Sequence, residues 1–381
     1  MDFSFTDEQH MLLDSTRRLI AARYSLEQRR GILASAQGFS REIWKEFGSL
    51  GLLALNIPAE DGGLDAGPIG TLLVSIALGE ALVIEPYLSS AVLATRAIAR
   101  LASPSQRQLW LPRMAEGELI VVLAHEEPTT RHSGSSICTQ AQRAGGGWTV
   151  DGRKAVVYHA PLADLLLVSA RTQAATGEEW GLFAVPRDSN GLKLHPFTTV
   201  DGQRAADVVL NAVEVHDGAR IGGNVAVELP AVLDYATAAL CAEALGALDK
   251  LLAMTIEYSR TRVQFGVPIG RFQALQHRRA DMLTHVEQAR SMAYFAASRC
   301  ELDDPTERTA SLSAAKVIVG QAARFVGQQA VQLHGGMGVT DELAVSHYFK
   351  RLLAAAMRFG STETHLERYS QIMGDRTVAA S

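Results

Sequence analysis

The sequence predicts a chain of three parts: a helical N-terminal domain, a small β domain and a C-terminal bundle of helices. Apolar residues recur at helical spacing up to about Glu116 and again after about Glu228, whereas short apolar runs separated by turn residues lie between. Four long amphipathic patterns with short connections follow Glu228 and are typical of a helix bundle. We therefore place the domains at residues 1–118, 119–228 and 229–381.

Capping signals mark the first helices. Thr6 and Gln9 form a capping box, and Ser40 is a favoured N-cap residue for a later helix that Gly51 ends. The apolar residues that follow these two caps are Met11, Leu12, Leu19 and Ile20, and Ile43, Trp44, Phe47 and Leu50, the second set facing inward. Helical patterns then continue to about Glu116, which makes this domain all-helical.

Short strand-like runs define the middle domain. They cover residues 148–152, 165–168, 181–185 and 206–210. Gly145, Gly146 and Gly147 stand in a hairpin context and not between a strand and a helix. We therefore interpret them as a turn and not as a dinucleotide-binding loop.

The C-terminal domain has a strong helix start and a strong helix stop. Asp304 is a cap, Pro305 suits the first helical position and Glu307 the third, while Gly335 and Gly336 end the pattern. The two apolar stripes of this region are Leu275, Met282, Val286, Ala289 and Ala293, and Leu312, Ala315, Val319, Ala322 and Val326.

Composition excludes several classes of function. With 47% apolar residues, 20% charged residues and a net charge of −5, the chain can bury a large core and presents no surface for nucleic acid. The N-terminus lacks the pattern of a signal peptide, and Glu80 interrupts the most apolar window, so we expect no integral membrane segment. Three distant cysteines fit a reducing cytoplasm, and the 11 histidines form no cluster, so we expect no metal.

Two motifs carry the chemistry. The first, residues 261–276, connects two helical patterns, and Arg262 there could bind a pyrophosphate while Gly266 and Gly270 allow close backbone approach. The second, residues 330–338, combines the Gln332 amide with a glycine helix end. Taken alone, the first motif is consistent with an ordinary solvated arginine at a helix end. The second alone is consistent with an ordinary glycine that ends a helix.

Together, in this order and spacing, the two motifs resemble the acyl-CoA dehydrogenase family. The resemblance extends over nearly the whole chain and includes the loop at residues 58–63 and the hairpin at residues 147–154. Residues 240–244 and 347–352 look most like the small subunit of pimeloyl-CoA-dehydrogenase-type enzymes, which work beside a larger homologous subunit.

The resemblance implies an acyl-CoA dehydrogenase-like fold with the three domains above, assembled as a dimer or a dimer of dimers. It implies FAD shared between subunits, an acyl-CoA substrate and an electron-transfer flavoprotein as electron acceptor. The residues that match the part holding a neighbour's FAD are Arg262, Phe265, Phe272, Gln273, Gln332, Gly335 and Gly336. Asp234 and Gly360 match substrate-binding positions.

The chain departs from the family in its own flavin half-site. Of the segment Thr-Glu-Pro-Gly-Ala-Gly-Ser, only the Glu-Pro core survives, at Glu127 and Pro128 within residues 126–132. The Trp-Ile-Thr segment beside the flavin is replaced by Val156, Val157 and Tyr158.

The catalytic base is the largest departure. Removal of a proton next to the thioester carbonyl needs a carboxylate aimed at that carbon. The two family positions for this base fall on Phe359, just before Gly360, and on Ala236, and neither side chain can accept a proton.

Substitute bases can be weighed by position. Asp234 lies two residues from Ala236 and thus on the other side of the helix. Glu243 shares a face with Ala236 but lies about 10 Å further along the helix, so it suits only a shifted substrate. Glu363 lies at the start of a helix, and we interpret it as a helix-capping residue.

Three interpretations follow. The first is the base-lacking subunit of a heteromeric acyl-CoA dehydrogenase in fatty acid or steroid side-chain catabolism. The second is a complete homo-oligomeric dehydrogenase with a relocated base such as Glu243. The third is a flavin-free helical scaffold, which would not need the polar set Arg262, Gln273 and Gln332. The acyl chain stays open.

Overall fold

The computed structural model describes residues 5–128, 137–174 and 177–379. The chain folds into two compact units. We call residues 1–29, 68–83 and 237–381 the helical unit and residues 30–67 and 84–236 the sheet unit. The predicted boundaries at residues 118 and 228 stay a prediction.

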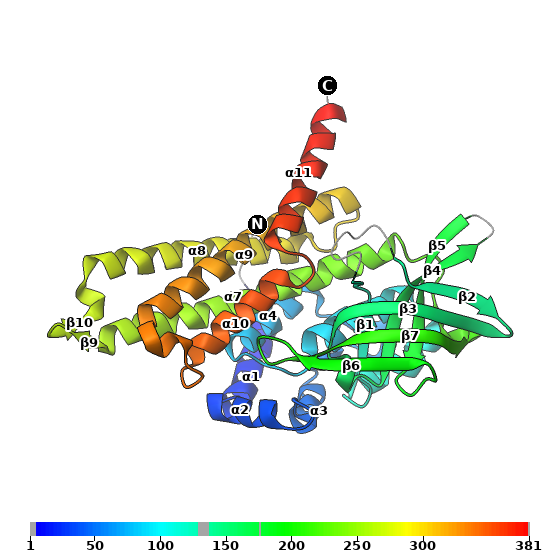
Figure 1. Ribbon diagram of the computed structural model, residues 1–381, viewed down its shortest axis with the longest axis horizontal. Helices are drawn as coiled ribbons and strands as arrows, with labels where there is room; N and C mark the ends of the chain where they lie inside the picture. The colour runs from blue at the N-terminus through cyan, green and yellow to red at the C-terminus, as the bar shows by residue number, and fades with distance from the viewer. Residues whose placement is uncertain (1–4, 129–136, 175–176, 380–381) are drawn as a thin grey trace. The chain divides into compact units, whose positions relative to one another are not determined.

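The helical unit is a bundle around α9, which packs against α8, α10 and α11 (Figure 1). Its helices are α1 (Asp7–Arg23), α4 (Gly67–Glu80), α7 (Glu228–Thr261), which begins in the sheet unit, α8 (Gln273–Arg299), α9 (Pro305–His334), α10 (Ala344–Met357) and α11 (Thr362–Ala379). The strands β9 (Val263–Gln264) and β10 (Val267–Pro268) form a small hairpin between α7 and α8. After Glu228 the three helices α7, α8 and α9 are long and the two that follow are shorter, where the sequence predicted four long ones.

The sequence pattern explains how α9 forms. The Asp304 carboxylate accepts hydrogen bonds from the amides of Thr306 at 2.8 Å and Glu307 at 3.3 Å, which confirms the predicted cap. All five residues of the predicted α9 stripe are buried, as are Met282, Val286, Ala289 and Ala293 of α8. Gly335 has φ +60° and ends the helix as expected.

The sheet unit contains one mixed β-sheet flanked by helices. The strand order is β6-β7-β3-β2-β4-β5-β8, and β1 pairs with β4 in parallel. The strands are β1 (Val121–Ala124), β2 (Gln140–Ala144), β3 (Gly147–Tyr158), β4 (Leu165–Ala174), β5 (Gly177–Pro186), β6 (Leu192–Thr198), β7 (Arg204–His216) and β8 (Arg220–Ile221). The helices are α2 (Leu26–Ala34), which begins in the helical unit, α3 (Arg41–Ser49), the π-helix Tyr87–Ala94, α5 (Thr95–Leu101) and α6 (Pro104–Ala115). Gly145 and Gly146 form the predicted turn between β2 and β3.

Two predicted apolar positions are exposed. Leu50 is 39% exposed because it is the C-cap residue of α3 and not part of the buried helix face. Met11 is 61% exposed, whereas Ile20 on the same helix is buried. The capping box at Thr6 and the Ser40 cap form as predicted, because they depend only on neighbouring residues.

One helix is long and apolar enough to cross a membrane. It is α7, and 89% of its most apolar window is buried inside the protein, as in the core helix of a globular bundle. In the helical unit α7 approaches α4 so closely that a β-carbon on Gly246 would lie 2.0 Å from the Ile76 carbonyl oxygen.

We predict that Gly246→Ala destabilises the protein, since the two helices must separate to admit the methyl group. Overpacking of this kind costs roughly 1–3 kcal/mol. Gly374→Ala in α11 is the control, because a β-carbon there meets nothing within 4 Å, and it should stabilise the helix by up to about 1 kcal/mol. Urea denaturation measures both variants, and equal stabilities would contradict the tight packing of α4 on α7.

Candidate functional site

The two sequence motifs meet at one end of the helical bundle. The Tyr258 ring on α7 stacks on the His334 ring on α9 with centroids 4.2 Å apart, and the Tyr258 hydroxyl donates to the His334 carbonyl at 3.5 Å. Arg262 follows Tyr258 by one helical turn, and Gly335 directly follows His334. The structure therefore brings together the residues that the sequence singled out separately.

The β9–β10 hairpin shapes the first motif. Phe265 has φ +53° and Gly266 φ +79°, so the tip of the hairpin is left-handed. A β-carbon on Gly270 would lie 2.8 Å from the Ser259 carbonyl oxygen, so the backbone at Gly270 packs closely against the end of α7. At Gly266 a β-carbon would meet no atom within 4 Å, so in the single chain a glycine is favoured there by its positive φ. Close approach of a ligand at Gly266 stays a prediction.

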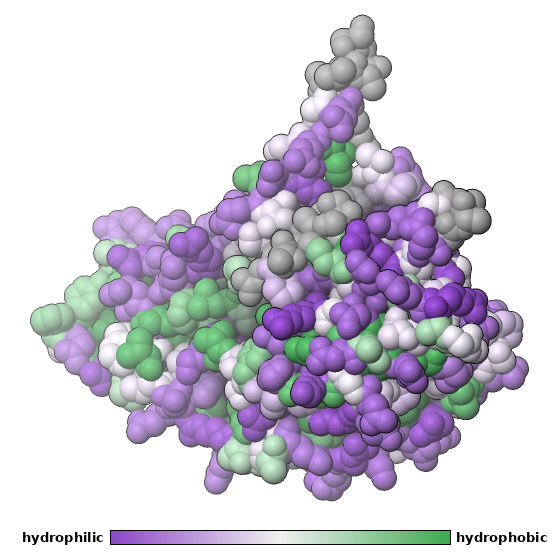
Figure 2. Space-filling view, turned by 45° about the vertical axis from the view of Figure 1, so that its right-hand side comes forward, coloured by the Kyte–Doolittle hydropathy of each residue, from purple (hydrophilic) through white to green (hydrophobic). Residues whose placement is uncertain are grey.

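All seven predicted FAD-contact residues are exposed in the single chain. Phe265 is 90% exposed and makes an edge contact with Phe272 at 6.1 Å between ring centroids. In Figure 2 apolar surface appears at the end of the molecule that carries the hairpin in Figure 1. An uncovered aromatic ring beside an arginine, an amide and a glycine helix end fits a ligand that is both flat and anionic.

The family's first base position lies in a rigid turn. Phe359 has φ +59° and Gly360 φ +112°, and the Phe359 carbonyl is hydrogen-bonded to the His365 ring at 2.9 Å. The Phe359 ring is half-buried under the Arg358 guanidinium, 5.0 Å from its centroid. The second position, Ala236, is fully buried. Neither place offers a proton acceptor.

The substitute carboxylates have other contacts. Glu243 accepts a hydrogen bond at 2.6 Å from the buried Arg351 guanidinium, which also donates to the Val83 carbonyl at 2.9 Å. This ion pair ties α7 to α10. Asp234 is buried. Glu363 lies in the first turn of α11, where a backbone amide and the Ser361 hydroxyl lower the pKa of its carboxyl, as its capping interpretation requires.

A buried ion pair in the sheet unit was not predicted from the sequence. Glu127 accepts from the Lys154 ammonium at 2.7 Å, from the Thr139 hydroxyl at 2.7 Å and from the Cys138 amide at 2.7 Å. These donors lower the pKa of Glu127 to about 2, although burial alone would raise it. Burial lowers the pKa of Lys154 to about 8 and that of His125 to about 4. The surviving Glu-Pro core therefore has a structural role here.

The segment that replaces the family's Trp-Ile-Thr is strained. Val156 has φ +51°, which a β-branched residue rarely adopts, and the pairing of β3 with β7 shifts between Lys154 and Val157. The Val156 amide donates to the Asp207 carboxylate at 2.9 Å, which holds the bulge. Strain of this kind is typical of functional segments. Thr129, Thr130, Arg131 and His132, where the sequence departs from the family's flavin-binding segment, lie outside the described residues.

Helical parts with a β-sheet part between them in the chain, and exposed aromatic rings beside an arginine at the end of the bundle, define the class: a helical–sheet–helical protein with a candidate site for a flat, anionic ligand. Comparison with known proteins identifies the family. The chain matches the acyl-CoA dehydrogenase N-terminal domain at residues 6–118, the middle domain at residues 119–214 and the C-terminal domain at residues 227–374. It belongs to the acyl-CoA dehydrogenase family, whose members are FAD-dependent oxidoreductases.

Relatives match the chain from end to end. "Acyl-CoA dehydrogenase FadE27" of Mycobacterium tuberculosis is 30% identical over 98% of this chain and 99% of its own length. The crystal structure of the ChsE4-ChsE5 complex from the same species superposes with a TM-score of 0.88 at 30% identity, covering 98% of this chain and 99% of that chain. A variant of the Tcur3481-Tcur3483 steroid ACAD superposes with a TM-score of 0.88 at 28% identity, covering 98% and 99%.

We predict that Glu127→Gln strongly destabilises the protein, because it leaves the Lys154 ammonium buried without its carboxylate. Breaking such a pair costs about 3–5 kcal/mol, whereas the double variant Glu127→Gln, Lys154→Met should recover much of that loss. In the wild type the Glu127 contribution is present above pH 4.5 and is lost as the pH falls toward 2. Denaturation from pH 7 to pH 3 tests this, and a single variant no less stable than the double variant would contradict it.

Proposed function

We propose that this chain is the base-lacking subunit of a heteromeric FAD-dependent acyl-CoA dehydrogenase, which desaturates a CoA thioester between its α- and β-carbons. One observation carries the proposal: Phe359 stands at a family base position in a backbone turn that is otherwise intact, with Gly360 at φ +112° beside it. At the family's second position for the base stands Ala236, which cannot accept a proton either and so supports the same proposal.

The relatives support a heteromeric assembly. ChsE4-ChsE5 is a complex of two named chains, and the Tcur3481-Tcur3483 steroid ACAD also carries two chain names. One chain from each of these structures covers 98% of this chain. By analogy, a larger homologous subunit that carries the missing glutamate is the partner, and a steroid side-chain thioester is one of the acyl groups that fit, beside pimeloyl and fatty acyl groups.

In the proposed assembly this chain binds a neighbour's FAD and helps to position the substrate. The Arg262 guanidinium would hold the pyrophosphate of a neighbour's FAD, with Phe265, Phe272 and Gln273 around the adenine side. Gln332, Gly335 and Gly336 would complete this part from the end of α9. FAD, when bound, accepts a hydride from the β-carbon of the thioester. Asp234 and Gly360 are the proposed substrate contacts, and the electrons would leave through an electron-transfer flavoprotein in the cytoplasm.

The alternative of a complete homo-oligomeric dehydrogenase requires Glu243 to act as base. Its carboxylate is engaged by Arg351 at 2.6 Å, and a base would have to leave that ion pair. A flavin-free scaffold would have no use for an exposed Phe265 ring beside Arg262. Both alternatives are distinguished from the main proposal by the flavin content and by the activity of the lone chain.

We predict that Arg262→Ala lowers FAD affinity by about 2–5 kcal/mol, the range for truncating one partner of a buried charge pair. Arg271→Ala is the matched control, since this exposed arginine lies in the same connection. The flavin-to-protein ratio after purification is the measurement. Adding Gln332→Ala should deepen the loss, and an unchanged flavin content in that double variant would contradict the shared-site role.

Sedimentation of the same preparations reports on assembly. The paired motifs act on a neighbour's cofactor, so the wild type should form a dimer or tetramer. A stable monomer with bound FAD would overturn the shared site.

We predict little or no dehydrogenase activity for the chain alone. Loss of a general base costs typically about 10²–10⁴-fold in rate. Anaerobic mixing with a panel of acyl-CoA thioesters, followed by flavin bleaching, is the test. Activity should appear on co-expression with a larger homologous subunit. Rapid bleaching by the lone chain, abolished in Glu243→Gln, would instead establish the homo-oligomeric alternative.

A further inference from the structure

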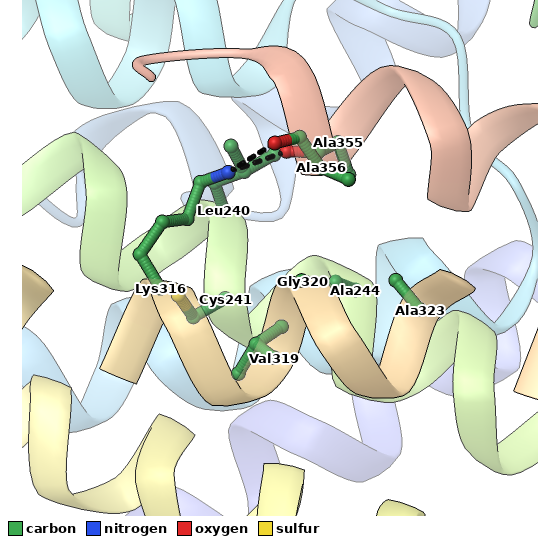
Figure 3. Close-up of a pocket in the computed structure, with 9 residues that line it drawn as sticks. All are labelled: Leu240, Cys241, Ala244, Lys316, Val319, Gly320, Ala323, Ala355 and Ala356. Atoms are coloured by element: carbon green, nitrogen blue, oxygen red, sulfur yellow. Dashed lines mark hydrogen bonds between the residues drawn. The ribbon is translucent and has the colours of Figure 1, made fainter. Parts of the chain in front are cut away.

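A small space lies beside Lys316, a buried lysine on α9. Its ammonium donates to the carbonyls of Ala355 at 2.9 Å and Ala356 at 3.0 Å near the end of α10 (Figure 3). A third bond, at 3.1 Å, goes to the Gly360 carbonyl, so all three donors of the ammonium are used. The space measures about 10 Å³, which is room for about one water molecule. Lys316 therefore caps α10 and offers nothing to a ligand.

A cleft in the sheet unit is far larger. It measures about 650 Å³, which is in the range of small-molecule sites. All its lining residues belong to the sheet unit, and they come mainly from the segment that connects α2 to α3, from the turn after β3 and from strand β6. The lining is notable for three arginines, two phenylalanine rings and one carboxylate: Arg41, Arg187, Arg204, Phe39, Phe197 and Asp164.

Arg187 is held by backbone groups on one side only. Its Nη1 atom donates to the carbonyl of Ala160 at 3.1 Å and to that of Pro161 at 2.6 Å. Among the described residues its Nε and Nη2 atoms have no hydrogen-bond acceptor. The side chain is exposed, so these remaining donors are open to a ligand that enters the cleft.

The other two arginines also have neutral partners. Arg204 donates to the Thr198 hydroxyl at 2.6 Å and to the Ser35 carbonyl at 3.2 Å, just after the end of α2. The Arg41 guanidinium lies 5.8 Å from the centroid of the Phe39 ring. Because these contacts hold the side chains before a ligand arrives, binding does not have to order them, which favours affinity.

The charge of the cleft is not balanced from within. None of the three arginines forms an ion pair with any residue that the structure describes. Asp164 is the one carboxylate among the lining residues, and one of its oxygens accepts from the Ile120 amide at 2.8 Å. Three arginines and one aspartate give the lining a net charge of +2. A cleft with an excess of one charge concentrates ligands of the opposite charge.

Phosphate is the anion that suits this lining best. Guanidinium groups bind phosphate oxygens bidentately, and a phosphate monoester carries a charge of about −1.5 to −2 at neutral pH, close to the charge that the cleft lacks. Phe197 is 37% exposed at the end of β6, whereas Phe39 is 5% exposed. An exposed ring beside guanidinium groups favours a ligand with a flat ring of its own.

We propose that this cleft binds a phosphate monoester that carries a flat ring. Arg187, Arg204 and Arg41 hold the phosphate, and the ring of the ligand packs against Phe197. The cleft shares no residue with the proposed contacts to FAD and to the acyl-CoA. The ligand is therefore a small molecule other than the cofactor and the substrate, and the site does not depend on the proposed function.

The test uses phenyl phosphate and inorganic phosphate as probes, each titrated into the purified full chain by calorimetry. The ring should make phenyl phosphate bind about threefold more tightly than inorganic phosphate. In Phe197→Ser this ratio should fall to about one while the affinity for inorganic phosphate stays unchanged. In Arg187→Met both affinities should fall about tenfold, because a charged hydrogen-bond donor is lost.

A matched control separates a built site from general charge attraction. Lys193 is an exposed lysine on β6 that does not line the cleft, so Lys193→Met should keep both affinities within about twofold. An equal loss in Lys193→Met and Arg187→Met would overturn the site. Where Arg187→Met does not fold, Arg41→Met decides, and an unchanged affinity for inorganic phosphate there would overturn the site as well.

Two further outcomes would overturn the proposal. One is a wild type that binds neither probe. The other is competitive displacement of phenyl phosphate by coenzyme A, which would make the cleft part of the substrate site. The flavin-to-protein ratio of the same preparations tests the proposed function separately, and it should be the same in Arg187→Met and Phe197→Ser as in the wild type.

Discussion

The burial of α7 is the constraint on which the helical unit depends. Where α7 is enclosed by its neighbours, it can carry a polar side chain only where a partner meets it. Glu243 meets Arg351 at 2.6 Å, Asp249 meets Arg290 at 2.6 Å, and Tyr258 stacks on His334. Each pairing fixes the register of α7 against another helix. Arg262, one turn beyond Tyr258, is carried to the end of the bundle by this register, and its carbonyl accepts a hydrogen bond from the Ile269 amide at 2.8 Å.

Local features of the fold were predictable from the sequence because their causes are local. The caps at Thr6, Ser40 and Asp304 require only a side chain and the amides two or three residues later. The buried stripe of α9 follows from helical spacing alone. The outward position of Leu50 was missed because the last residue of a helix no longer follows the face of the preceding turns. The resemblance to the family supplied the site residues, which spacing alone had left as an ordinary arginine and an ordinary glycine stop.

The buried charges could not be predicted in the same way. Lys154 and Glu127 are 27 residues apart, and Lys316 and Gly360 are 44 residues apart. In a single sequence a lysine on an otherwise apolar helix face predicts a solvated side chain. Only the fold shows that strand β3 carries Lys154 to Glu127, or that the end of α10 is directed at Lys316. The positive φ of Val156 could not be predicted either, because a β-branched residue does not indicate a left-handed backbone.

The turn at Phe359 separates two requirements that a catalytic position normally combines. The backbone must hold successive residues at φ +59° and +112°, which needs Lys316, His365 and a glycine at position 360. The chemistry needs one carboxylate on the first of these residues. The residue type at position 359 affects a single half-buried side chain, whereas loss of the backbone geometry would remove the Gly360 carbonyl as the third acceptor of the buried Lys316 ammonium. If the chain is the base-lacking subunit that we propose, the packing of α9, α10 and α11 holds this turn independently of the side chain at residue 359.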